Sequence, residues 1–197
     1  MLQVTKEQLI SVLKSKNYLV YTDHRPNIVG IRSATRSAGK FDDTCAVWWT
    51  DNGKEYFHTY TITTDPGLTY LGNPIKGSNG TAILVPGQYI DTYQLGSHRG
   101  KQQALIQTTG KVKVYRDNNK DAVLNMDPST ITEGFYGINL HHGSETDGEI
   151  INGWSAGCQV WRYHIPHEAM IKEFTELSKA HKFNKFTYTL ILEEDLK

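Results

Sequence analysis

Apolar residues recur at helical spacing in two segments, one near each end of the chain. In the first, about Thr5–Ser15, Thr5 and Gln8 form the capping-box pattern that begins many helices. In the second, about Pro166–His181, Pro166 suits a first helical turn and apolar side chains recur every three or four positions. We therefore expect an N-terminal helix and one late helix.

Between these segments, short runs of β-branched and aromatic residues bounded by turn residues predict strands. The expected strands are 27–33, 44–50, 55–63, 81–91, 103–108, 111–115, 137–142 and, after the late helix, 186–193. Asp51-Asn52-Gly53 is a strong hairpin signal between two of them. Glycine-punctuated stretches at 66–80 and 143–153 read as loops. This order predicts a mostly β domain with one packed late helix and an N-terminal helix.

Composition narrows the class of protein. A chain of 197 residues suits one domain, and no run approaches the length of a membrane span. Lys and Arg together number 21, as do Asp and Glu, which argues against a nucleic-acid binder that neutralises phosphates. Two cysteines exclude a disulfide-dense scaffold and a four-cysteine zinc site. The first residues lack the pattern of a signal peptide, so we expect a cytosolic protein, one released by another route, or a mature chain.

One segment carries a candidate nucleophile. Cys158 lies in a turn of small residues, where Gly157 lets nearby backbone N–H groups point inward to hold an oxyanion. A thiol is a weak nucleophile until a base or a positive field acts on it, and His141 and His142 lie just upstream. A strand ending in histidine and a turn carrying cysteine can meet at one sheet edge. The same residues also fit a buried structural cysteine beside two strand-end histidines.

The local sequence resembles the catalytic motif of the L,D-transpeptidase family (the YkuD domain), a His-Gly followed by a spacer and Ser/Thr-x-Gly-Cys. The matching residues are His142-Gly143 and Ser155-Ala156-Gly157-Cys158, with 16 positions from His142 to Cys158. Val85-Pro86-Gly87-Gln88-Tyr89 is similar to the family's Pro-Gly strand. The resemblance covers about 40–193. It implies an L,D-transpeptidase-like β-sandwich as the catalytic domain at 40–197, preceded by a helix-and-strand extension at 1–39.

The resemblance also implies roles. Cys158 would take the acyl group of a peptidoglycan stem peptide as a thioester, and His142 would take the thiol proton and return it to the leaving amine. Ser155 and Gly157 would shape the turn, with backbone N–H groups of Gly157 and Cys158 in the oxyanion hole. Neither a metal nor an organic cofactor is required.

The choice of base stays open between the two neighbouring histidines. Adjacent strand residues face opposite ways, so one of them at most can face Cys158. The motif favours His142, because it precedes Gly143, and His141 is the alternative base.

Other residues near the motif are candidates for contact with the substrate. Gly143, Tyr136 and Arg162 are expected there; Arg162 is the nearest arginine, since Val160 stands where the family commonly has one. Asn139 could line the pocket or orient a ring.

Several further residues have ordinary structural interpretations. Cys45 and the four tryptophans are expected to pack in the core or on strand faces. His164 and His167 are expected on the surface at the start of the late helix. Asp147 and Glu149 could join the histidine pair at a metal, but no zinc-hydrolase motif is present, so no metal site is expected.

Three functions remain open. The first is an L,D-transpeptidase acting on peptidoglycan stem peptides. The second is a wall-peptide hydrolase with the same fold, an L,D-carboxypeptidase or endopeptidase; a phage endolysin released at lysis, for example, would need no signal peptide. The third is a non-catalytic β module that binds the wall. The substrate in each case lies outside the cytoplasm, and the sequence does not indicate an oligomeric state.

Overall fold

The structure is a computed structural model that describes residues 2–143 and 150–197. Its helices are α1 (Lys6–Ser15), α2 (Leu68–Gly72) and α3 (His164–His181), with 3-10 turns η1 (Pro128–Thr130) and η2 (Glu193–Leu196). Eight strands belong to one sheet: β1 (Asn27–Arg32), β2 (Asp43–Asp51), β3 (Lys54–Thr63), β5 (Gly87–His98), β6 (Gln102–Gln107), β9 (Leu140–His142), β10 (Gln159–Trp161) and β11 (Phe186–Leu192). The remaining three are β4 (Thr81–Leu84), β7 (Val112–Asp117) and β8 (Thr132–Gly134).

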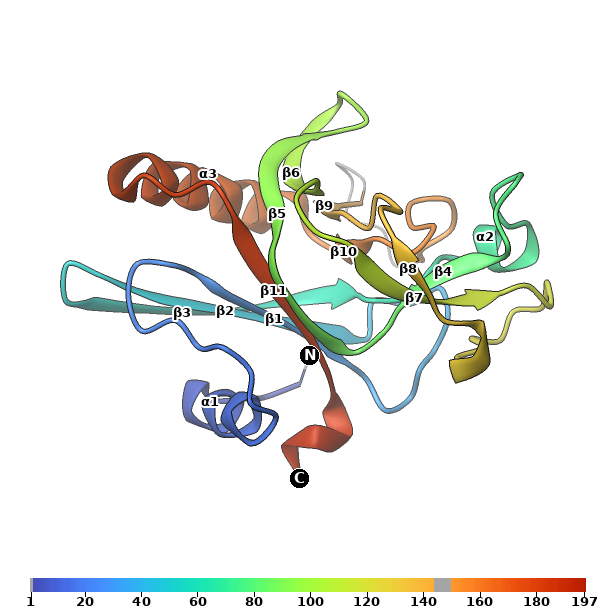
Figure 1. The fold of residues 1–197 in the computed structure, drawn as a ribbon, viewed down its shortest axis with the longest axis horizontal. Coiled ribbons are helices and arrows are strands. Elements are labelled where there is room, and N and C mark those ends of the chain that lie inside the picture. Colours follow the sequence, from blue (N-terminus) through green and yellow to red (C-terminus); the bar gives the residue numbers. More distant parts are fainter. Residues whose placement is uncertain (1, 144–149) are drawn as a thin grey trace.

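The strands form a closed barrel and a small second sheet (Figure 1). The barrel order is β1-β11-β5-β6-β9-β10-β3-β2, and the second sheet has the order β4-β7-β8. The mostly β class predicted from the sequence is therefore confirmed. The two facing sheets of the expected sandwich are not confirmed, because eight of the strands close into a barrel instead.

Both predicted helices are present. Thr5 caps α1, with its side chain accepting from Gln8 N and the Gln8 side chain accepting from Thr5 N, so the predicted capping box is confirmed. The late helix begins at His164, two residues before the expected start. Figure 1 shows α1 and α3 on opposite faces of the β1–β2–β3 part of the barrel.

The residues of strand β2 are buried on both of its faces, one toward α3 and the other toward α1. Its alternate residues Cys45, Val47 and Trp49 belong to the main core, where α3 also packs. The intervening Ala46 and Trp48 belong to a second apolar cluster that contains α1. Because side chains alternate along a strand, a strand buried on both faces needs apolar residues on each side, and α3 and α1 contribute to the two sides here.

Four local predictions need correction. The expected strand 81–91 breaks at Pro86 into β4 and β5, which lie in different sheets. The expected loop 66–80 contains the short helix α2, and only 140–142 of the expected strand 137–142 pairs as β9. Strands β8 and β10 were not predicted; each has three residues, too few for a period to be visible in the sequence.

The N-terminal part of the chain is joined to the rest by backbone pairing. Strand β1 pairs with β2 and, in parallel, with β11. The boundary at 39/40 stays a prediction, although β1 belongs to the same barrel as the later strands. Among the described residues, none of the helices has both the length and the apolar character required to cross a bilayer.

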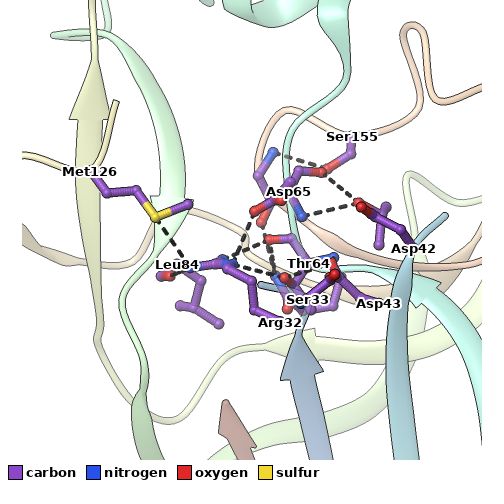
Figure 2. Close-up of polar contacts among 12 residues, drawn as sticks. Arg32, Ser33, Asp42, Asp43, Thr64, Asp65, Leu84, Met126 and Ser155 are labelled. Atoms are coloured by element: carbon purple, nitrogen blue, oxygen red, sulfur yellow. Dashed lines mark hydrogen bonds and ion pairs between the residues drawn. The ribbon is translucent and has the colours of Figure 1, made fainter. Parts of the chain in front are cut away.

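A buried arginine connects β1 of the barrel with the residues that follow β3 and with β4 of the second sheet (Figure 2). Arg32 is fully buried, and its Nε lies 3.0 Å from Asp65 Oδ1. The guanidinium also donates to Thr64 Oγ1, Thr64 O and Leu84 O. Asp43, equally buried, accepts from Ser33 N, Thr64 N and Thr64 Oγ1.

One cation thus faces two buried carboxyl groups. Burial, and then the charge of Asp65, raises the pKa of Asp43 to about 7. Burial also raises the pKa of Asp65, while the adjacent Arg32 opposes that rise. The charge of Arg32 is therefore needed to keep this group of carboxyls compatible with the core.

Candidate active site

The turn that carries Cys158 is held by hydrogen bonds of Ser155. Ser155 Oγ accepts from Gly157 N at 3.1 Å and donates to Cys158 O at 2.8 Å. Gly157 has φ +124°, and a Cβ there would lie 2.4 Å from Ala82 O. Glycine is therefore required at this position for both conformation and space. Because its N–H donates to Ser155 Oγ, the expectation that Gly157 N–H serves an oxyanion hole needs correction; Cys158 N–H remains the candidate.

The sulfur of Cys158 faces the backbone that leads into β9. Its thiol donates to Gly137 O at 3.4 Å, and Asn139 N–H donates to the sulfur at 3.5 Å. An N–H directed at sulfur stabilises the thiolate over the thiol. The side chain is 8% exposed, so a substrate could reach only one edge of the thiol.

The structure brings His141, not His142, to this sulfur. A ring nitrogen of His141 lies within 4.8 Å of Cys158 Sγ. The ring of His142 is on the α3 side, where its Nε2 lies 3.7 Å from Glu168 Oε1. The prediction that His142 is the base is therefore corrected to His141. Alternation along a strand guarantees that the two rings diverge, but the packing of the 155–158 turn decides which one meets the thiol.

The hydrogen bonds of His141 identify its free nitrogen. Nδ1 lies 2.7 Å from His142 O, and since a carbonyl only accepts, Nδ1 carries the proton. Nε2 is buried and has no hydrogen-bond partner among the described residues. A neutral imidazole in this tautomer presents an unshared electron pair at Nε2, which is what a general base requires.

A second histidine, His98 at the end of β5, was missed by the sequence reasoning. Its ring stacks on that of His141 with centroids 3.9 Å apart and planes 13° apart. Asn139 Oδ1 accepts from Gln107 N, so the amide nitrogen of Asn139 donates to His98 Nδ1 at 3.0 Å. The expectation that Asn139 orients a ring is met, although the ring belongs to His98. Nothing in the sequence marks His98, because a single histidine on a strand has no distinctive spacing.

Burial keeps this thiol and both imidazoles neutral. It lowers the pKa of His141 to about 3, with the neighbouring His98 adding to the effect, and it lowers the pKa of His98. Burial also raises the pKa of Cys158, although the Asn139 N–H works in the opposite direction. The resting state is therefore a thiol beside a neutral imidazole, and a proton would move only as the sulfur attacks.

This protonation state predicts a distinctive pH profile for alkylation. The rate at which iodoacetamide modifies Cys158 is expected to rise from about pH 5 to about pH 10 without levelling off near neutrality, because the thiolate is the reactive form. Mass spectrometry of the Cys45→Ala variant, which leaves one thiol, measures it. A plateau reached below about pH 7 would instead indicate a thiolate–imidazolium pair.

The same three side chains have the donor types of a metal site. One ligand atom from each of His98, His141 and Cys158 lies within 4.8 Å of the others, the one such group among the residues that the structure describes. Two nitrogens and a sulfur suit Zn²⁺. However, the Asn139 amide donates to His98 Nδ1, which leaves the proton of neutral His98 on Nε2. A metal at Nε2 would have to displace that proton, so we derive no metal chemistry from the group.

The expected substrate residues are dispersed. Tyr136 and Ala156 line a surface groove of ≈ 490 Å³ beside the cysteine turn. Gly143 lies against Trp154, since a Cβ there would be 2.6 Å from that ring. Arg162 lies outside the groove; its guanidinium carbon is 5.2 Å from the centroid of the Tyr163 ring.

The remaining histidine prediction is wrong in part. His164 is half-buried, but His167 is fully buried, with its ring 5.3 Å from those of His142 and Trp161. Helix α3 turns this residue toward β9 and β10. Cys45, Trp48, Trp49 and Trp161 are buried as expected. Asp147 and Glu149 lie outside the described residues.

No protein-family model matches this sequence, and no curated protein or solved structure is similar to it. The likeness to L,D-transpeptidases therefore rests on short local motifs, chiefly the one around Cys158. What the site can do has to be argued from its own geometry.

Proposed function

We propose that this protein is a cysteine acyl-transfer enzyme of the L,D-transpeptidase type, acting on peptidoglycan stem peptides. The observation that carries the proposal is that a ring nitrogen of His141 lies within 4.8 Å of the Cys158 sulfur, while His141 Nε2 has no hydrogen-bond partner in the part of the chain that the structure describes. The turn motif supplies the substrate class, and the finer fold assignment, an L,D-transpeptidase-like catalytic domain, belongs to the same proposal.

The reaction follows from the two neutral groups. His141 Nε2 takes the proton of the Cys158 thiol as the sulfur attacks the substrate carbonyl, and a carbon–sulfur bond forms. The resulting imidazolium returns that proton to the departing amine as the carbon–nitrogen bond breaks, which leaves a thioester. A second amine, or water, then attacks the thioester, gives its proton to His141 and releases the thiol.

The decisive experiment is incubation of the purified protein with a stem tetrapeptide, with and without an amine acceptor. A new amide between the two indicates a transferase, whereas a shortened peptide alone indicates a hydrolase. Exposure to a carbapenem is expected to add one drug mass at Cys158. Absence of both products and of any adduct would leave the non-catalytic wall-binding module as the better interpretation.

The assignment of the base makes a separate prediction. His141→Gln is expected to lower kcat by at least about 10²-fold, because general-base catalysis contributes 10²–10⁴-fold. His142→Gln serves as the matched control. Its fold-loss in kcat is expected to be at least about tenfold smaller than that of His141→Gln, since the His142 ring is on the α3 side. Steady-state kinetics of both variants measures this. A greater loss for His142→Gln would restore the choice favoured by the motif.

A further inference from the structure

The groove beside the cysteine turn is lined by basic and neutral residues. It is lined by the loop Ile75–Gly80 and by Thr81, Ala82, Arg116, Thr132, Tyr136 and Ala156. Arg116 and Lys76 are its charged residues, and none of these lining residues is acidic. The groove therefore favours an anionic ligand.

Arg116 is held in a fixed orientation at this groove. Its Nε donates to Thr132 Oγ1 at 3.0 Å, and its guanidinium carbon lies 4.1 Å from the centroid of the Tyr136 ring. Nη1 donates to Gly80 O at a long 3.4 Å. Among the described residues, no carboxylate lies within ion-pair distance of Arg116, whereas Arg25, Arg32 and Arg36 each have one.

The groove adjoins the reacting turn. Ala156, which lines it, is two residues from Cys158, and Ala82, another lining residue, is the residue that a Cβ at Gly157 would strike. Tyr136 directly precedes Gly137, whose carbonyl accepts from the Cys158 thiol. Cys158 itself does not line the groove, but a ligand seated there would contact Tyr136 and Ala156, which lie one residue before Gly137 and two residues before Cys158.

We propose that this groove binds a carboxylate-bearing segment of the acyl-donor peptide and that Arg116 is the residue that recognises the carboxylate. A planar guanidinium held by stacking and by hydrogen bonds to Thr132 and Gly80 presents its remaining N–H groups to a carboxylate. The inference rests on the proposed function for the identity of the ligand, a stem peptide. Arg116, which lies on β7, thus takes the substrate-contacting role that the sequence had suggested for Arg162.

The test measures binding rather than turnover. Titration calorimetry on Cys158→Ala compares a stem tetrapeptide with the same peptide amidated at every carboxylate. Amidation is expected to weaken binding by about tenfold or more, the range of a charge-assisted hydrogen bond. Adding Arg116→Gln is expected to weaken binding of the free acid by a similar factor and to leave binding of the amidated peptide unchanged.

Lys113→Gln is the matched control, because Lys113 lies on the same strand, is exposed and is not among the groove residues. It is expected to change neither affinity. Arg116→Lys, which keeps the charge but not the fork, is expected to give an intermediate loss and also serves if the glutamine variant fails to fold. An equal loss for both peptides, no loss, or no binding by Cys158→Ala would overturn the inference.

The two proposals can fail separately. If the peptides bind as described but the unaltered protein neither transfers nor hydrolyses them, the proposed function fails and the groove assignment stands. If the unaltered protein turns the peptides over and Arg116→Gln does so with unchanged KM, the groove assignment fails and the function stands.

Discussion

Replacing Cys158 with alanine is expected to lower kcat/KM for stem-peptide turnover by at least about 10³-fold, because the substitution removes the thiol that lies within 4.8 Å of a His141 ring nitrogen. A factor of this size corresponds to about 4 kcal/mol of transition-state stabilisation. Product analysis by mass spectrometry measures it. Turnover that survives the substitution would reject Cys158 as the nucleophile.

Cys45→Ala is the matched control for this experiment. Cys45 is fully buried in strand β2, and burial raises the pKa of its thiol well above the ordinary range. Its loss is expected to cost stability through a small cavity but to leave turnover unchanged. Circular dichroism of both variants tests that the fold persists. A comparable loss of turnover in both would indicate a general effect on folding rather than the loss of a nucleophile.

Arg32→Met is expected to lower the free energy of unfolding by about 3–5 kcal/mol, the range found when one partner of a buried ion pair is removed. The substitution removes the buried guanidinium beside Asp65 and Asp43. It also removes the donors to Thr64, which directly follows β3, and to Leu84, the last residue of β4. Chemical denaturation followed by tryptophan fluorescence measures the change.

The matched control is Arg36→Met. Arg36 Nη2 lies 3.1 Å from Glu194 Oε1, and both side chains are at least 40% exposed. An exposed pair contributes about 0–1 kcal/mol, so this variant is expected to unfold almost as the unaltered protein does. Equal losses in the two variants would mean that burial of Arg32 is not what makes its charge important.

The destabilisation by Arg32→Met is also expected to depend on pH. A carboxyl whose pKa is raised in the folded state holds its proton where the unfolded chain has lost it, so stability falls as pH rises through that interval. For Asp43 the interval runs from its ordinary value of 3.8 to about 7. Removing Arg32 raises the folded-state pKa further. The loss should therefore be smaller near pH 5 than near pH 8, and a loss independent of pH would contradict the account.

The buried network also reaches the cysteine turn. Gln159, the residue after Cys158, donates to Thr64 O at 3.4 Å and to Gly157 O at 3.3 Å. Thr64 O is the carbonyl that accepts from Arg32 Nη2. The cysteine turn is therefore connected to the buried Arg32 through Gln159 and Thr64, and an Arg32 variant that still folds would be informative about the site as well.

Local sequence features were sufficient for some elements of this protein. The α1 capping box and the Asn52-Gly53 hairpin, whose two residues have φ 49° and 76°, depend only on neighbouring residues. The need for glycine at 157 could be stated in advance because the motif puts it beside the nucleophile. Shorter strands such as β8 and β10 could not be predicted, since their three residues pair only because distant strands are in place.

For the candidate site, too, some features could be predicted from the sequence and others depend on the tertiary structure. That a thiol in a turn of small residues could meet one imidazole was indicated by the order of residues along the chain, which also fitted a buried structural cysteine. That the imidazole is His141, that His98 stacks against it and that Arg116 borders the groove followed from how β5, β7 and β9 are arranged around the turn. A side-chain period of two makes neighbouring residues diverge, but only long-range strand pairing and packing select which of them faces inward.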